Sequence, residues 1–295
     1  MLSLGTAGGA AADDFPSCTQ ACGGAQVRAL PLTTHQLLTK SIARRRAPRH
    51  AGMMETWHAA TYGDRIAEIY DEETRVSAEP AVAFLAPLAA GGRALELGIG
   101  TGRLALPLAS QGIDVLGIDA SEAMVSKLRA KPGGQEIAVT VGDFADVSIE
   151  GTFELIFVAV SSFFALVTQE DQVRCFANVA AHLAAGGAFV VDAFVPNPGL
   201  FPQEQRLATH RVDLDEVELI AGRHDPVAQR VRSVQIRLSQ DGIRLYPIQI
   251  RYAWPAELDL MAQLAGLRLR ERAGGWSGEP FTAGSRAHIS VYERG

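Results

Sequence analysis

Between Arg93 and Phe194 the sequence alternates short apolar runs with amphipathic runs of helical period, and this alternation restricts the fold more than any other feature. The apolar runs are short and nearly continuous, so they predict strands that are buried on both faces. Right-handed helical crossovers between parallel strands satisfy this pattern. We therefore expect an α/β chain with a doubly wound, Rossmann-like, mostly parallel sheet and helices on both faces. The predicted strands are residues 93–99, 114–120, 137–143, 153–161 and 188–194, and the predicted helices are 102–112, 121–131 with Ser121 as N-cap, and 168–187 with a glycine C-cap.

The pattern changes after Pro198, where apolar and polar residues alternate with a period of two. This alternation is typical of antiparallel strands with one buried face, and the dipeptide Asp241-Gly242 is a hairpin signal. We expect a late antiparallel β insertion over 199–252. A helix over 257–266 and two closing strands over 267–275 and 287–294 complete the predicted elements.

Residues 1–52 are small, low in complexity and locally basic, which predicts a disordered N-terminal extension. The alternative is that translation of the functional protein starts at Met53 or Met54. The ordered domain is predicted over 53–295. Its first element is a helix within 56–73 that places Ile66, Ile69 and Tyr70 on one face.

The composition excludes several functional classes. A formal net charge of −6 argues against a nucleic-acid partner or an anionic membrane surface. No apolar run approaches the length of a membrane span. The three cysteines, Cys18, Cys22 and Cys175, form neither a disulfide framework nor a zinc site, which favours ordinary thiols in the cytoplasm and no metal.

A glycine-rich turn joins the first predicted strand to the first helix, in the stretch "ALELGIGTGRLALPLA". In a doubly wound sheet such a turn binds a ligand beyond the carboxyl ends of the strands. A dinucleotide fingerprint requires Gly or Ala at its sixth position, where this chain has Arg103. Glycines at every second position, preceded by the acid Glu96, suit a ligand without a pyrophosphate that carries a cation.

The segment "LELGIGTGR" resembles the signature of class I S-adenosylmethionine-dependent methyltransferases, and "VLGIDAS" and "VTVGDFAD" follow in the family's order. The resemblance spans about residues 53–295. It implies S-adenosyl-L-methionine as co-substrate, with Asp119 at the ribose hydroxyls and Asp143 and Phe144 at the adenine. The implied cofactor residues are Glu96, Gly98, Gly100, Gly102, Asp119, Asp143, Phe144, Tyr62 and Tyr70. For Asp119 a helix-terminal role, for Asp143 a turn role and for the tyrosines helix packing are the alternatives.

Subclass motifs limit the methyl acceptor. The chain lacks the Asn/Asp-Pro-Pro-aromatic run of nucleic-acid amino methyltransferases, the Pro-Cys nucleophile of cytosine C5 enzymes and the Asp-Asn pair of metal-dependent catechol enzymes. Its layout is similar to small-molecule methyltransferases of bacterial secondary metabolism, with the late β insertion near the acceptor site. The predicted pocket residues are Ser161, Phe163, Phe164 and Trp254, with Asp192, Phe194, Trp276 and His288 nearby or packed. Glu170 is the candidate general base, although Thr168 and Asp171 place it in a capping box.

Methyl transfer requires the protein mainly to align donor and nucleophile and to exclude water, because a sulfonium methyl is already a good electrophile. The predicted function is therefore transfer of a methyl group to a small-molecule acceptor by in-line displacement. Two alternatives stay open at this point: a non-catalytic S-adenosylmethionine-binding module and a nicotinamide-dependent oxidoreductase. The sequence does not indicate the oligomeric state.

Overall fold

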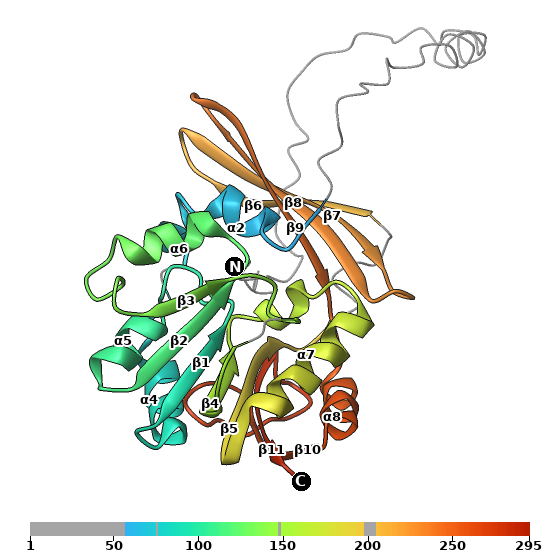
Figure 1. Cartoon of the computed structure of the whole chain (residues 1–295). Coiled ribbons are helices and arrows are strands. Elements are labelled where there is room, and N and C mark those ends of the chain that lie inside the picture. Colours follow the sequence, from blue (N-terminus) through green and yellow to red (C-terminus); the bar gives the residue numbers. More distant parts are fainter. Residues whose placement is uncertain (1–56, 75, 147–148, 198–204) are drawn as a thin grey trace, which may run out of the picture. The chain divides into compact units, whose positions relative to one another are not determined.

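A computed structural model describes residues 57–74, 76–146, 149–197 and 205–295. The predicted extension over 1–52 lies outside the described residues, as does the start of the predicted insertion. Two sheets organise the described part of the chain, one of seven strands and one of four (Figure 1). The domain boundaries proposed from the sequence stay predictions.

The seven-stranded sheet has the order β10-β11-β5-β4-β1-β2-β3. Its five parallel strands are β1 (Arg93–Leu97), β2 (Asp114–Asp119), β3 (Ala138–Val141), β4 (Phe153–Val158) and β5 (Leu183–Phe194). Two antiparallel strands, β11 (Ala287–Arg294) and β10 (Leu267–Ala273), extend the sheet beyond β5. Strand order reverses at β1, which pairs with β2 on one side and with β4 on the other. The predicted α/β class is confirmed, and a ligand is expected at this reversal.

Helices cover both faces of the large sheet, and each face has its own apolar core. The helices α4 (Glu79–Ala89), α5 (Ala105–Ser110) and α6 (Glu122–Arg129) bury Leu85, Leu108 and Leu128 against one face. The opposite face packs against α7 (Gln169–His182) and α8 (Pro255–Leu264), with Phe176, Phe189 and Tyr292 at its centre. Burial of such side chains contributes about 1.5–3 kcal/mol each, so the two cores fix the sheet on which the site is built.

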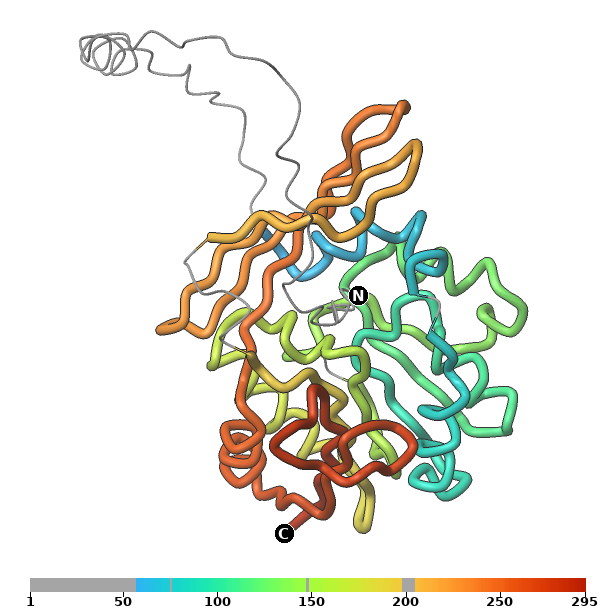
Figure 2. Tube along the Cα trace, turned by 180° about the vertical axis from the view of Figure 1, so that it is seen from behind, coloured from blue at the N-terminus to red at the C-terminus, as the bar shows by residue number. Residues whose placement is uncertain are grey.

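The second sheet is antiparallel and runs in the order β6-β7-β8-β9. Its strands are β6 (Gln205–Val212), β7 (Glu216–Asp225), β8 (Arg230–Ser239) and β9 (Gly242–Arg251). This sheet confirms the predicted antiparallel insertion. The β8–β9 turn consists of Gln240 and Asp241, and Gly242, which pairs with Ser239, has a φ of 120°. Strand β9 crosses α2 (Thr61–Ile66) and the 3-10 helix η2 (Ser162–Ala165), so the small sheet lies beside the site end of the large one (Figures 1 and 2).

Several predictions of local structure are corrected, and one helix was missed. The predicted helix within 56–73 is two short helices, α2 and α3 (Tyr70–Glu73), and both Ile66 and Ile69 are buried. Helix α5 begins three residues late because the loop continues through Gly102. The period-two alternation over 211–222 predicts one strand, but these residues straddle the turn between β6 and β7. Helix α4 was not predicted.

The predicted glycine C-cap of α7 is also wrong. The helix ends at His182, Leu183 is extended, and β5 begins at once. Gly187 lies inside β5, where an added Cβ would come within 3.0 Å of the Phe153 carbonyl oxygen. Close approach of the β4 backbone therefore explains this glycine.

Candidate cofactor site

The glycine loop is the turn from β1 into α5, at the point where the strand order reverses. Gly98 and Gly102 both have positive φ, 75° and 79°, which glycine adopts without strain. A Cβ on Gly102 would lie 2.2 Å from the Leu128 side chain, so α6 packs directly on the loop. A Cβ on Gly98 would lie 3.4 Å from Ser162, which follows β4. The loop backbone therefore lies close to the segment that follows β4.

Asp119, at the end of β2, is bonded to the glycine loop. Its Oδ2 accepts a hydrogen bond from the Gly100 N–H at 2.8 Å, and its Oδ1 accepts one from the Ser121 N–H at 2.9 Å. Ser121 caps α6 as predicted, because its hydroxyl accepts a bond from the Met124 N–H. Burial raises the pKa of Asp119, and the two backbone N–H groups oppose that shift. Each carboxylate oxygen can accept a further hydrogen bond.

Glu96 is a buried acid beneath the same loop, with 5% of its surface exposed. Its carboxylate accepts a bond from the Ala105 N–H, but its Oε2 has no hydrogen-bond partner. Burial raises the pKa of Glu96 to about 8, while the charge of Arg103 acts in the opposite direction. An unpartnered buried oxygen is costly, so a ligand donor placed at this atom would be stabilising.

Two short helices, α2 and α3, lie over the glycine loop. Asp71 of α3 accepts a bond from the Thr101 hydroxyl at 2.6 Å and pairs with Lys131 at 2.7 Å. Asp64 of α2 accepts a bond from the Ser121 hydroxyl at 2.6 Å. These contacts fix the tyrosine-bearing segment to the loop and to the start of α6.

The tyrosines of this segment face the charged groups of the site. Burial raises the pKa of Tyr70, and Arg103, Glu96 and Asp119 are close enough to influence it. Burial also raises the pKa of Tyr62, which is adjacent to Tyr70. The structure therefore brings both tyrosines beside the glycine loop.

Asp143 and Phe144 follow β3 and differ in exposure. Asp143 is exposed, and its Oδ1 accepts a bond from the Ala145 N–H, which is the turn geometry considered as its alternative role. Phe144 is buried, and its ring would lie 3.8 Å from a Cβ on Gly98. Phe144 therefore borders the loop.

The turn after β4 has an unusual backbone. Val160 and Ser161 have φ of 57° and 55°, values that are uncommon for non-glycine residues and exceptional for a β-branched one. Asp192 of β5 holds this turn: its Oδ2 accepts a bond from the Val160 N–H at 2.7 Å and its carbonyl oxygen accepts one from the Ser161 N–H at 2.9 Å. The Ser161 hydroxyl in turn accepts a bond from the Phe194 N–H. Burial raises the pKa of Asp192 to about 6, opposed by the Val160 N–H, the Arg103 charge and a hydrogen bond from Trp276.

This turn directs the predicted pocket aromatics into the core. Phe163 and Phe164 are fully buried and make edge contacts with Phe176 and Phe194 respectively. Ser162 is the residue of this segment that lies against Gly98, and sequence reasoning did not single it out. Ser162 lies close to Gly98 because Val160 and Ser161 before it have positive φ. No sequence pattern predicts that conformation.

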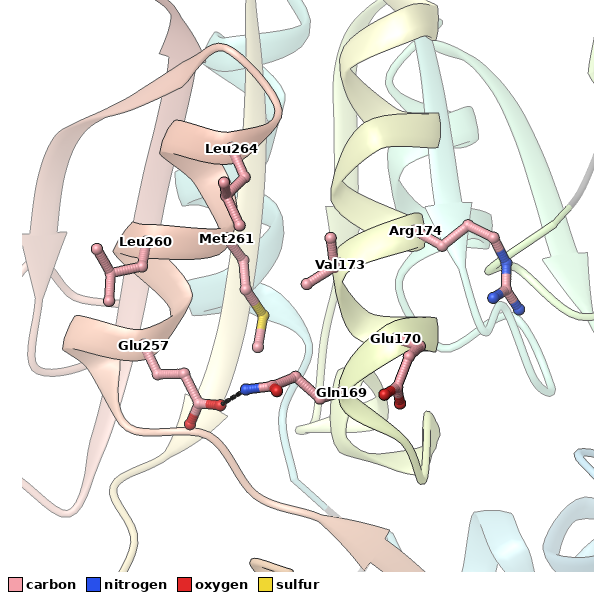
Figure 3. Close-up of a pocket in the computed structure, with 8 residues that line it drawn as sticks. All are labelled: Gln169, Glu170, Val173, Arg174, Glu257, Leu260, Met261 and Leu264. Carbon is pink, nitrogen blue, oxygen red and sulfur yellow. Dashed lines mark hydrogen bonds between the residues drawn. The ribbon is translucent and has the colours of Figure 1, made fainter.

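Two other predicted acceptor-site residues are exposed. Trp254 is 41% exposed immediately before α8. Glu170 is exposed in the first turn of α7, where Thr168 caps the helix by accepting a bond from the Asp171 N–H. Glu170 borders a groove of about 570 Å³ between α7 and α8, to which Met261 of α8 also contributes (Figure 3).

In the described part of the chain, neither His182 nor His288 is hydrogen-bonded to the glycine loop. His182 ends α7, and its Nδ1 contacts the Asn178 carbonyl oxygen. His288 is buried in β11, and its Nδ1 contacts the Ser290 hydroxyl.

No group of three or more His, Cys, Asp or Glu residues that could hold a metal occurs among the residues that the structure describes. Within the same residues, no helix is long and apolar enough to span a membrane.

Known proteins share this arrangement. Residues 94–187 match the family described as "Methyltransferase domain". The cypemycin N-terminal methyltransferase of a Streptomyces species is 30% identical over 207 residues, covering 69% of this chain and 84% of the relative. The CcbJ methyltransferase structure from Streptomyces caelestis is 39% identical, with a TM-score of 0.76 and coverage of 81% of this chain and 99% of that one.

A third structure shows likeness of fold alone. SAM-bound CalS10, an amino pentose methyltransferase from Micromonospora echinaspora, is 20% identical with a TM-score of 0.58, covering 78% of this chain and 98% of that one. Together with the glycine loop and the unpartnered oxygen of Glu96, these matches identify the co-substrate as S-adenosyl-L-methionine. The chain belongs to the class I S-adenosylmethionine-dependent methyltransferases.

Proposed function

We propose that this methyltransferase transfers a methyl group to a small-molecule acceptor, with the methionine end of the cofactor held between Glu96 and Arg103. The observation that carries the proposed cofactor orientation is the Glu96 Oε2, which is buried without a hydrogen-bond partner. The α-ammonium of the cofactor supplies the missing donor. Arg103 lies near Glu96 and carries the charge that suits the α-carboxylate.

The adenosine part of the cofactor lies along the carboxyl ends of β2 and β3 in this proposal. Asp119 accepts the ribose hydroxyls with the lone pairs that Gly100 and Ser121 leave free. Phe144 packs against the adenine ring, and Asp143 accepts from the adenine amino group after giving up part of its turn role. Tyr62 and Tyr70 close the site from α2 and α3 and exclude water from the methyl region.

The acceptor approaches between the turn after β4 and the small sheet. In-line displacement forms a bond from the acceptor lone pair to the methyl carbon and breaks the sulfonium C–S bond, leaving S-adenosylhomocysteine. Alignment carries most of the rate, because a near-attack arrangement is worth about 7–11 kcal/mol. Ser161 and Ser162 are the polar groups of this segment, and Phe163 and Phe164 support it from below. Trp254 and Glu170 are further acceptor-site candidates, with Glu170 the candidate base.

Three considerations support a small-molecule acceptor. The net charge of −6 disfavours nucleic acid. The sequence lacks the nucleic-acid motif after β4, where Ser161 and Ser162 stand. CalS10, whose fold is similar, acts on an amino pentose according to its name.

The decisive experiment is a calorimetric titration of the full chain with S-adenosylhomocysteine, with NADH as the competing candidate. We expect micromolar binding of S-adenosylhomocysteine alone and a loss of about tenfold to a hundredfold or more in Asp119→Ala, because a charge-assisted hydrogen bond contributes about 1.5–3 kcal/mol. Asp114→Ala is the matched control, since Asp114 begins the same strand and pairs on the surface with Arg93. Unchanged affinity in Asp119→Ala would refute the proposed cofactor orientation.

Turnover then tests the acceptor. Methyl transfer from labelled S-adenosylmethionine is measured on panels of small amines, phenols and sugars, beside RNA and protein fractions. Transfer to a small molecule supports the proposal, whereas labelling confined to RNA or protein overturns it.

A further inference from the structure

A group of charged side chains joins the small sheet to α3. Arg237 of β8 donates hydrogen bonds to Glu218 of β7 and to Glu73 of α3. The Glu218 side chain is fully buried, and the side chains of Arg237 and Glu73 are 13% and 25% exposed. The Arg237 guanidinium also lies 5.9 Å from the ring centre of Tyr246 on β9. Because these side chains are largely shielded from water, separating Glu73 from Arg237 costs more than breaking a surface ion pair.

Apolar contacts accompany this charged contact. Tyr246 packs with Ile66 and Ile69 of the segment that carries α2 and α3, and with Met124 of α6. Strand β9 and α2 lie side by side (Figure 1). We call residues 61–73 the lid. One side of the lid is therefore held by the small sheet.

The other side of the lid lies on the cofactor site. Asp71 accepts a hydrogen bond from the Thr101 hydroxyl of the glycine loop, and Asp64 accepts one from the Ser121 hydroxyl. A Cβ on Gly63 would lie 2.5 Å from the Cβ of Ser121, so α2 directly contacts the start of α6. The lid therefore lies between the small sheet and the glycine loop.

The buried position of Glu96 indicates that the lid must open. Only 5% of the Glu96 surface is exposed, and its Oε2 is buried. In the proposed cofactor orientation, on which this step rests, the ligand ammonium has to reach that oxygen. The helices α2 and α3 have six and four residues, which is too short for a helix to be stable by itself. Contacts with neighbouring elements therefore decide whether the lid stays closed.

We propose that Arg237 is a positioning residue that holds the lid closed over the cofactor site, and that the cofactor enters and leaves when Glu73 separates from Arg237. The pair lies on the sheet side of the lid, so it stabilises the closed lid equally with and without the cofactor. A contact of equal strength in both states does not change the dissociation constant. It slows entry and exit of the ligand by the same factor, because both require the lid to open.

Two variants weaken the pair without removing the partner of the buried Glu218. Glu73→Ala leaves Arg237 bonded to Glu218, and alanine is a better helix former than glutamate, so α3 loses no intrinsic propensity. Arg237→Lys keeps a positive charge beside Glu218 but lacks the planar fork that bonds two carboxylates. Glu68→Ala is the matched control. Glu68 lies on the same lid and pairs with Lys127 of α6 at 2.7 Å, but its side chain is 83% exposed.

Stopped-flow fluorescence of the full chain measures the association and dissociation rates of S-adenosylhomocysteine. In Glu73→Ala and in Arg237→Lys we expect both rates to rise by at least about fivefold, while the dissociation constant stays within about threefold of wild type. The double variant should be no faster than the faster single variant, because both changes act on one pair. Glu68→Ala should alter each rate by less than about twofold, since an exposed ion pair contributes little.

Hydrogen exchange, read by mass spectrometry on peptides within 57–74 and corrected for intrinsic rates, measures opening of the lid directly. Without ligand, protection should fall at least about fivefold in Glu73→Ala and in Arg237→Lys and stay unchanged in Glu68→Ala. Unchanged protection in the first two variants overturns the role of Arg237, whether or not S-adenosylhomocysteine binds.

Two further results overturn the role of the lid in ligand exchange. One is reduced protection with unchanged ligand rates. The other is a weaker dissociation constant with an unchanged association rate, which would make Glu73 a ligand contact. If the wild-type chain binds no S-adenosylhomocysteine, the proposed function fails and the entry route fails with it, whereas hydrogen exchange still decides whether Arg237 holds the lid.

Discussion

Replacing Glu96 by glutamine tests whether the buried carboxylate of Glu96 lowers the stability of the protein when no cofactor is bound. Burial raises the pKa of Glu96 from 4.5 to about 8 in the folded protein without cofactor. A raised carboxyl pKa means that the folded state binds the proton more tightly than the unfolded state does. This contribution to stability is therefore complete below about pH 4.5 and is lost as the pH rises through 8.

The magnitude follows from the size of the shift. A change from 4.5 to about 8, at 1.36 kcal/mol per pKa unit, corresponds to about 5 kcal/mol of stability lost between the two limits. Glutamine retains the carbonyl that accepts from the Ala105 N–H and carries no charge. Its NH₂ group stands beside Arg103 without an acceptor, which costs about 1–3 kcal/mol. We expect Glu96→Gln to be more stable than wild type by about 2–4 kcal/mol at pH 9.

The assay is urea unfolding without cofactor at pH 6, 7.5 and 9, with S-adenosylhomocysteine affinity measured in parallel. The wild-type free energy of unfolding should decrease relative to that of the variant as the pH rises, while the variant binds the ligand at least tenfold more weakly. A variant less stable than wild type at pH 9, or two parallel pH profiles, would show that Glu96 is stabilised by a partner within the chain.

Experiments at three other positions have specific expected results. Asp71→Asn removes the ion pair with Lys131 that fixes α3 beside the glycine loop, and calorimetry should show S-adenosylhomocysteine affinity reduced by up to about fivefold, since a half-exposed pair contributes up to ~1 kcal/mol. Asp192→Ala leaves the Val160 N–H without its acceptor and should lower the free energy of unfolding by about 1–3 kcal/mol in urea; an unchanged value would mean that the turn after β4 does not depend on β5. Cys175 is fully buried and burial raises the pKa of its thiol, so in a variant whose other two cysteines are serine a thiol reagent should react only after denaturation.

The parallel part of the fold could be predicted from the sequence because its strands are short, apolar and separated by glycines and capping residues. The turn between β1 and α5 shows why the contact between the glycine loop and Asp119 could be predicted: these residues meet across one β–α unit. Ser121 capped α6 as expected from its side-chain chemistry. These features depend on spacing alone, which the sequence displays directly.

Other features depend on contacts between distant segments. Phe163 and Phe164 follow the left-handed residues Val160 and Ser161, and their direction is set by hydrogen bonds from β5 that no local pattern encodes. Helix α4 was not predicted from the sequence because Pro87 lies within its last turn. A proline usually indicates the end of a helix.

The electrostatics of the site also couple cofactor binding to the release of a proton from Glu96. Glu96, with a pKa of about 8, is mostly protonated at neutral pH before the ligand arrives, whereas the ligand ammonium requires the carboxylate. Binding must then release a proton, and the dissociation constant of S-adenosylhomocysteine should fall by about tenfold per pH unit between pH 6 and 7.5 before levelling near pH 8. At pH 7 the release should approach one proton per site, which calorimetry in phosphate and in Tris measures through their different ionisation enthalpies. In Glu96→Gln both the pH dependence and the buffer dependence should disappear, and their persistence there would assign the proton to Asp192 or to another group.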